Sequence, residues 1–120
     1  MKTAAEFFEE KLAYESTPTG VRQIIDKKDK NYILVDVRDP DTYKKGHVPG
    51  AINIYSPDLE RGLKKLPKNK TIIFYCYNIT CFAAPKAALF AAKKGYTVME
   101  MFGGFEEYKN RGHPVEKGGK

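Results

Sequence analysis

The sequence predicts an α/β domain in which a parallel β-sheet carries helices on both faces. Four short apolar runs, at residues 32–37, 51–54, 71–75 and 97–101, alternate with segments that carry helix start signals and glycine stops. The chain has 120 residues, which is close to the usual size of one domain, and it holds no internal repeat or linker rich in proline and serine. We therefore expect one domain built around one core.

Two helix starts precede the first apolar run. Residues 3–6 have the spacing of a capping box, and the threonine-proline pair at residues 17–18 is typical of a second helix start. We predict a helical extension over residues 1–16 and the domain proper over residues 17–120. The apolar positions that give the two segments a helical period are Phe7, Phe8, Leu12, Val21, Ile24 and Ile25.

The rest of the chain alternates strands with capped helices. The run at residues 32–37 is rich in β-branched side chains, which favours a strand that is covered on both faces. Asp39 and Pro40 begin a short helix that Gly46 ends. The later helices are expected to begin at Ser56 and carry Leu59, Leu63 and Leu66, to span residues 82–94 before Gly95, and to lie around Phe105 and Tyr108 before Gly112.

Cys76 is the residue that most clearly indicates chemistry. It directly follows the apolar run at residues 71–75, and the helix expected over residues 82–94 begins a few residues later. Ligands of parallel sheets lie beyond the carboxyl ends of the strands. Loop N–H groups and the helix N-terminus are expected to point at this sulfur, to lower the pKa of the thiol and to hold an anion. Cys76 is therefore predicted to be a sulfur nucleophile.

Composition narrows the class of protein. The chain is 42% hydrophobic and 30% charged, and no apolar run reaches membrane-spanning length, so we expect a cytoplasmic protein with no membrane partner. Two cysteines do not make a secreted disulfide framework. The net charge of +6 comes from lysines spread along the chain, and only four arginines are present. This pattern argues against a nucleic-acid partner, but the positive charge is compatible with attraction of small anionic substrates.

Four motifs, in this order, resemble a single-domain rhodanese. They are LVDVRD at residues 34–39, GHVPGAIN at residues 46–53, FYC at residues 74–76, and the pair GGF and GHPV at residues 103–105 and 112–115. Rhodaneses are sulfurtransferases. The resemblance implies a rhodanese-like α/β sandwich with a five-stranded, mainly parallel sheet. Its fifth strand would come from around residues 13–17, which pattern alone does not show.

The resemblance also implies a site and a reaction. Cys76 would carry sulfane sulfur as a persulfide, without metal or organic cofactor. The donor would be a small anion such as thiosulfate, or a persulfide, and the acceptor a thiol or cyanide, including a protein thiol. The residues expected to bind the donor and the terminal sulfur are Tyr77, Asn78, Ile79, Thr80 and Phe82, through backbone amides, and Lys86 as the nearby cation.

The loop after Cys76 departs from the family's pattern. It has no glycine and no arginine, and the Ala87-Ala88 step of the next helix falls two positions later than usual. The loop is therefore either about two residues longer than usual, or the helix begins with an irregular turn. Because thiosulfate is a dianion and the site lacks an arginine, we expect weaker thiosulfate activity than in a member that has one.

Cys81 leaves three interpretations open. It is a resolving thiol that forms a disulfide with Cys76, an alternative nucleophile with Lys86 five residues after it, or a small buried side chain at the start of the helix. A Cys76–Cys81 dithiol would also suit a catalytically silent module that binds a partner or senses redox state. A phosphatase or arsenate reductase is disfavoured, because position 82 is Phe where an arginine would clamp the oxyanion.

The remaining polar candidates have structural interpretations. His47 and His113 lack the paired spacing of a zinc finger, so we predict no metal site and expect both to satisfy backbone groups. Asp36 and Arg38 lie at a strand's carboxyl end, near the predicted site. They either border its mouth, with Asp36 as an acceptor of N–H groups from a neighbouring loop, or have a structural role in the turn through hydrogen bonds or an ion pair, and we favour the structural role.

Overall fold

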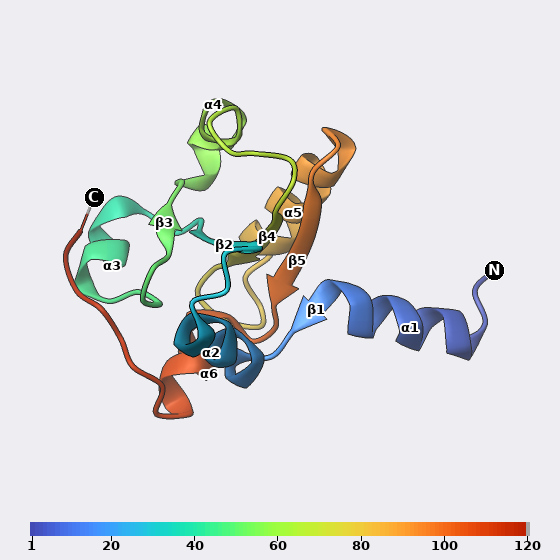
Figure 1. Cartoon of the computed structure of the whole chain (residues 1–120), viewed down its shortest axis with the longest axis horizontal. Coiled ribbons are helices and arrows are strands. Elements are labelled where there is room, and N and C mark those ends of the chain that lie inside the picture. The colour runs from blue at the N-terminus through green and yellow to red at the C-terminus, as the bar shows by residue number, and fades with distance from the viewer. Residues whose placement is uncertain (120) are drawn as a thin grey trace.

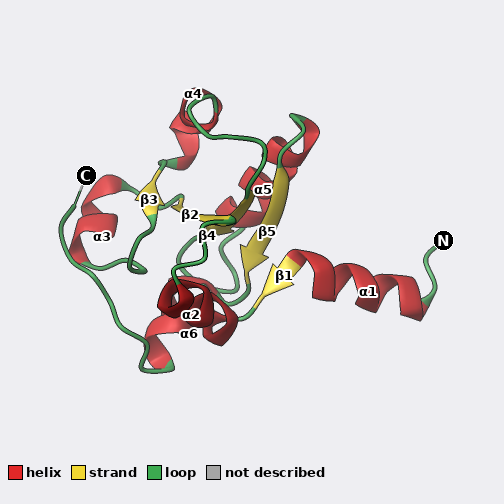
Figure 2. Ribbon diagram, viewed as in Figure 1, coloured by secondary structure: helices red, strands yellow, loops and turns green. Residues whose placement is uncertain are grey.

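The structure, a computed structural model, describes residues 1–119 and shows one parallel β-sheet between two layers of helices (Figures 1 and 2). All strand pairs are parallel, and the strand order across the sheet is β1-β5-β4-β2-β3. The strands are β1 (Glu15–Ser16), β2 (Tyr32–Asp36), β3 (Ile52–Asn53), β4 (Thr71–Tyr75) and β5 (Thr97–Met101).

The helices divide between the two faces of the sheet. On one face, α4 (Leu59–Leu63) and α5 (Ala83–Lys93) pack their apolar side chains with those of the sheet. On the other face, α2 (Pro18–Lys27), α3 (Pro40–Lys45) and α6 (Gly104–Asn110) do the same. The alanines of α5 that face the sheet, Ala84, Ala87 and Ala91, are buried, which lets the helix lie close to the strands.

Strand β4 lies at the centre of the sheet and positions the candidate site. It pairs with β2 on one side and β5 on the other, and Ile72 to Tyr75 are fully buried. Continuous burial of consecutive residues is expected for a parallel strand that helices cover on both faces. Cys76 follows this strand, so it leaves the sheet at the middle of its carboxyl edge.

Helix α1 (Ala4–Tyr14) projects from the body of the domain (Figure 1). Thr3 and Glu6 form the predicted capping box, and none of the eleven residues of the helix is buried. None of the described helices is long and apolar enough to cross a membrane.

The predicted fold class is confirmed, with differences in detail. The sheet is wholly parallel, and the strand that the family resemblance implied near residues 13–17 is β1, at the edge. The helix expected from Ser56 is broken into the 3₁₀ turn η1 (Ser56–Asp58) and α4, and Leu66 lies beyond its end. The boundary between residues 16 and 17 stays a prediction, and the last residue of the predicted domain lies outside the described residues. Both residues of β1 belong to the predicted extension.

Candidate active site

Cys76 occupies the predicted strand end, but its sulfur points into the core. The side chain is 2% exposed and packs among apolar residues that include Ala84 and Leu59. Its Sγ accepts a hydrogen bond from the backbone N–H of Ala84 at 3.4 Å, and the thiol donates to the backbone carbonyl of Cys81 at 3.2 Å. The first turn of α5 therefore lies over the sulfur, as the strand-loop-helix layout predicted.

The prediction of a lowered pKa for Cys76 is wrong for this conformation. Burial raises the pKa of the thiol to about 12, assisted by its hydrogen bond with Cys81. The backbone N–H groups of Ala84 and Tyr77 favour the thiolate, but they do not offset the loss of solvation. Cys76 is thus a neutral thiol in the resting structure.

The pKa of the Cys81 thiol is shifted in the opposite direction. Partial burial opposes ionisation, but hydrogen bonds from the Ala83 backbone, the Cys76 side chain and the Tyr77 backbone outweigh it and lower the pKa of the Cys81 thiol. Its side chain is half-buried rather than enclosed. Both cysteines are free thiols. The Tyr77 backbone, which sequence reasoning assigned to Cys76, therefore favours the thiolate of both cysteines.

The cysteine loop, residues 76–82, is closed by its own turn. Asn78 Oδ1 accepts hydrogen bonds from the Thr80 backbone N–H at 3.1 Å and from the Thr80 hydroxyl at 2.9 Å. The Cys81 N–H donates to the Asn78 carbonyl at 3.1 Å. Two of the amides that were expected to cradle a terminal sulfur are therefore engaged within the loop.

Helix α6 holds the cysteine loop from the other side. The N–H groups of Phe105 and Glu106 donate to the carbonyls of Cys76 and Tyr77, each at 2.9 Å. Gly104 makes this approach possible, because a Cβ on it would lie 2.8 Å from both the Cys76 carbonyl oxygen and the Asn78 nitrogen. Its φ of +67° also favours glycine.

A second tether joins the loop to α3. The Tyr77 hydroxyl donates to Asp39 Oδ2 at 2.6 Å, while Asp39 also caps α3 by accepting from the Thr42 backbone N–H at 2.9 Å. The hydrogen bonds from Tyr77 and Thr42 hold the pKa of the Asp39 carboxyl well below its usual range. Tyr77 is therefore oriented by a carboxylate that stays ionised.

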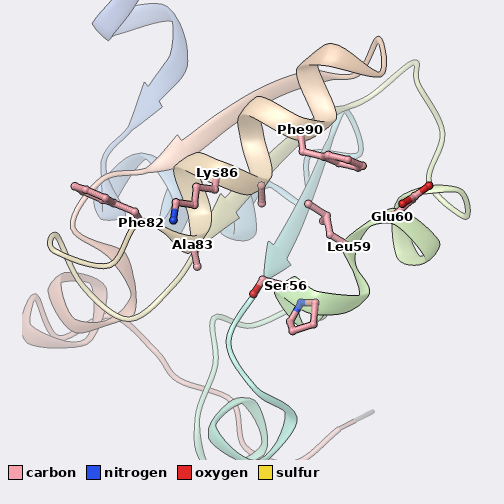
Figure 3. Close-up of a pocket in the computed structure, with 9 residues that line it drawn as sticks. Ser56, Leu59, Glu60, Phe82, Ala83, Lys86 and Phe90 are labelled. Atoms are coloured by element: carbon pink, nitrogen blue, oxygen red, sulfur yellow. The ribbon is translucent and has the colours of Figure 1, made fainter.

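An open groove of about 520 Å³ lies beside the cysteine loop, between α5 and the segment of η1 and α4 (Figure 3). Figure 3 shows Leu59 and Phe90 across from one another at one end, and Lys86 near Ala83 where α5 begins. Lys86 makes no ion pair with another described residue. Phe82 is largely exposed. Neither cysteine lines the groove, so a donor within it would still have to displace part of the loop.

Asp36 and Arg38 form a buried ion pair, which is one of the two structural roles that we favoured from sequence. Arg38 Nη2 lies 2.7 Å from Asp36 Oδ2 and donates to the Gly46 carbonyl at 2.6 Å. Both side chains are almost fully buried, and the guanidinium lies 4.3 Å from the centre of the Phe105 ring. The pair ties the turn after β2 to the loop that contains His47, rather than lining the mouth of the site.

The hydrogen bonds of the two histidines are with residues other than the cysteines. His47 is buried, bonds to the Tyr43 carbonyl at 2.8 Å and contacts Glu116 Oε1 at 3.1 Å. His113 bonds to the Thr19 hydroxyl at 3.3 Å, so only His47 meets the expected backbone group. Among residues 1–119, no three His, Cys, Asp or Glu side chains are grouped as metal ligands would be.

The structure thus brings together Cys76, Cys81 and the residues of the loop, and leaves Lys86 exposed one turn into α5. Sequence reasoning did not assign the roles of Ala84, Asp39 and Gly104. The paired glycines at residues 103–104 before a helix were the one available signal, since such a pair favours left-handed backbone.

Comparisons with known proteins agree with this geometry. The family model described as the rhodanese-like domain matches residues 17–111. Thiosulfate sulfurtransferase GlpE of Coxiella burnetii is 29% identical over 94 residues, which cover 78% of this chain and 85% of GlpE. The crystal structure of the BH2092 protein of Bacillus halodurans superposes with a TM-score of 0.90 at 37% identity, covering 95% of this chain and 84% of that one.

A further relative is longer than this chain. The HTH-type transcriptional regulator Rv0324 of Mycobacterium tuberculosis is 39% identical over 85 residues, which are 71% of this chain. The match spans only 38% of the regulator's length. The likeness is therefore to one part of that protein.

Proposed function

Because the chain belongs to the rhodanese-like domain family, we propose that it is a sulfurtransferase that carries sulfane sulfur as a persulfide on Cys76. Similarity to GlpE supports sulfur transfer at the level of the family. The observation that carries the finer proposal is the pair of thiols at the carboxyl end of the central strand, beneath the first turn of α5.

The reaction has two displacement steps. The Cys76 thiolate attacks the outer sulfur of a donor such as thiosulfate, and the bond between the two donor sulfurs breaks, so that sulfite leaves with the electron pair. An acceptor thiolate or cyanide then attacks the terminal sulfur of the Cys76 persulfide. This step releases the acceptor persulfide or thiocyanate and restores the Cys76 thiolate. No net oxidation of the protein occurs.

Cys81 supplies the base that this sequence of steps needs. Burial raises the pKa of the Cys76 thiol, whereas hydrogen bonds, one of them with the Cys76 side chain, lower the pKa of the Cys81 thiol. Movement of the Cys76 proton to Cys81 would give the nucleophile without involving an outside base. Lys86, exposed at the start of α5, supplies the positive charge that attracts an anionic donor.

Intact-mass spectrometry tests the proposal. Reduced protein is incubated with thiosulfate or polysulfide, beside the variants Cys76→Ser and Cys81→Ser. We expect a gain of one sulfur atom that Cys76→Ser abolishes and that Cys81→Ser slows at neutral pH but leaves intact at high pH.

Two other outcomes would overturn the assignment. A gain that persists in Cys76→Ser and disappears in Cys81→Ser would make Cys81 the nucleophile. A loss of two hydrogen atoms without uptake of sulfur would instead mean a Cys76–Cys81 disulfide and a redox-sensing module.

A further inference from the structure

Tyr77 directly follows Cys76, and each of its three polar groups has a partner. Its backbone N–H favours the thiolate of both Cys76 and Cys81. Its carbonyl accepts a hydrogen bond from the Glu106 N–H at 2.9 Å, and its hydroxyl donates to Asp39 Oδ2 at 2.6 Å. The orientation of this one residue therefore decides how an amide donor lies beside the two sulfurs.

The bond to Asp39 fixes a side chain that lies at the surface. The Tyr77 side chain is 41% exposed, so burial alone does not hold it in one orientation. The Arg38 guanidinium lies 5.9 Å from the centre of the Tyr77 ring, near the outer limit of a cation–π contact. Hydrogen bonds to a charged acceptor are about twice as strong as those between neutral groups. The Asp39 carboxylate is therefore the stronger of these two restraints on Tyr77.

Asp39 is itself held at the start of α3. Its Oδ1 accepts the Thr42 backbone N–H at 2.9 Å, and its Oδ2 accepts the Thr42 hydroxyl at 2.7 Å. The Asp39 carbonyl accepts the N–H of the buried Tyr43 at 3.0 Å. These bonds serve α3, whereas the bond to Tyr77 reaches a loop 38 residues further along the chain. The carboxylate thus links a packed helix start to the residue beside Cys76.

The negative charge of Asp39 does not by itself favour a reactive sulfur. A carboxylate near a thiol favours the neutral thiol, because a thiolate carries the same sign of charge. A favourable effect of Asp39 on the reaction must therefore come from the placement of Tyr77. The effects of charge and placement on the rate have opposite signs, so an experiment can separate them.

We propose that Asp39 is a positioning residue, which holds Tyr77 so that the Tyr77 backbone N–H stays directed at the sulfurs of Cys76 and Cys81. The inference rests on the proposed sulfur chemistry of Cys76. When the hydroxyl bond is lost, the start of the loop keeps its bonds to α6 but loses its tether to α3. The amide is then less often in place, and the thiolate fraction near neutral pH falls.

The pH dependence of thiol labelling in the full chain tests the proposal. Tyr77→Phe removes the hydroxyl and leaves the charge of Asp39 unchanged. We expect iodoacetamide to label Cys81 about threefold more slowly at neutral pH, but at the wild-type rate in alkaline buffer, where the thiol is ionised in both chains. Sulfur uptake from thiosulfate at neutral pH should slow by a similar factor.

Tyr55→Phe is the matched control. It also removes a hydroxyl from a surface tyrosine, since Tyr55 is 40% exposed, but it lies between β3 and η1 rather than in the cysteine loop. We expect it to label and to take up sulfur like the wild-type chain. Urea unfolding of both variants measures stability separately from these rates.

Asp39→Ser tests whether Asp39 acts through Tyr77. Serine is a good N-cap, so it preserves the start of α3, but its shorter side chain does not extend to the Tyr77 hydroxyl. We expect slower labelling of Cys81 at neutral pH, and no further slowing when Tyr77→Phe is added to Asp39→Ser. Faster labelling in Asp39→Ser, or additional slowing in the double variant, would overturn the proposal.

The labelling and uptake measurements separate this inference from the proposed function. If the wild-type chain takes up no sulfur on Cys76, the proposed function is wrong, and the labelling rates still decide whether Asp39 positions Tyr77. If the wild-type chain takes up sulfur and Tyr77→Phe keeps the wild-type pH profiles, the positioning role is wrong and the proposed function stands. A lower unfolding midpoint with unchanged pH profiles would likewise reduce the bond to a structural one.

Discussion

Cys76 and Cys81 lie five residues apart in one loop, and the pKa values of their thiols are shifted in opposite directions, upward for Cys76 and downward for Cys81. The difference comes from where each sulfur points, because the Cys76 sulfur lies inside the core, while the Cys81 sulfur remains partly exposed beside three hydrogen-bond donors. Cysteine reactivity follows the thiolate fraction and access. Both properties favour Cys81 over Cys76 for reaction with a small alkylating reagent that arrives from solvent.

Alkylation should therefore begin at Cys81. With iodoacetamide at neutral pH, we expect Cys81 to be modified at least tenfold faster than Cys76, as read by fragmentation of the peptide that holds both. Because burial raises the pKa of Cys76 to about 12, its thiol stays neutral below that pH, and its labelling should rise steeply only in strongly alkaline buffer. Equal labelling rates at neutral pH would show that the core does not enclose Cys76 in solution.

The buried Asp36–Arg38 pair makes a prediction about stability. Arg38→Ala removes the cation that pairs with the fully buried Asp36 carboxylate, and such a loss costs about 3–5 kcal/mol. Urea unfolding followed by circular dichroism measures the change. Arg61→Ala is the matched control, because its pair with Asp58 is exposed and should change the unfolding midpoint little. Similar effects of the two changes would argue against a structural role for Arg38.

At the scale of elements, the cysteine loop is held in place by two helices, α5 and α6. Helix α5 begins over the Cys76 sulfur, and α6 donates two backbone hydrogen bonds to the first two loop carbonyls. Displacement of α6 should therefore change the chemistry of the loop as well as the stability of the domain.

Gly104→Ala tests this coupling. The new Cβ would approach three loop backbone atoms within 2.9 Å, and its backbone has φ +67°. We expect a loss of roughly 2 kcal/mol or more in the free energy of unfolding, together with slower sulfur uptake. Gly112→Ala is the control, since φ is +78° there but nothing lies within 4 Å of the added Cβ. If both variants take up sulfur at the wild-type rate, α6 does not position the loop.

Local pattern predicted the elements that have a period or a cap, and missed what depends on tertiary packing. Runs such as residues 71–75 and caps such as Asp39 carry their own signal, and the structure confirms both. Strand β1 has only two residues, too few to show a period, so it entered the prediction through family resemblance alone. The pKa of Cys76 was predicted in the wrong direction, because strand position does not specify whether a sulfur points into the loop or into the core.

At the scale of the whole molecule, α1 is expected to contribute little to the stability of the domain, whereas strand β1 contributes to it. Because no residue of α1 is buried within one chain, deletion of residues 1–14 should leave cooperative unfolding and sulfur uptake near the level of the full chain. Both are compared with the full chain in the same buffer and at the same protein concentration. Deletion of residues 1–16 also removes β1 and should lower the unfolding midpoint further. A chain that fails to fold without residues 1–14 would contradict this division.

Strand β1 pairs in parallel with β5, and the Ser16 hydroxyl bonds to the carbonyl of Glu100, 84 residues later. During translation, the start of the chain therefore has no docking site until almost all of the domain has left the ribosome. Chains grow by about 5–20 residues per second, so β1 waits for several seconds before β5 has been synthesised. The β1 edge of the sheet is therefore expected to close last.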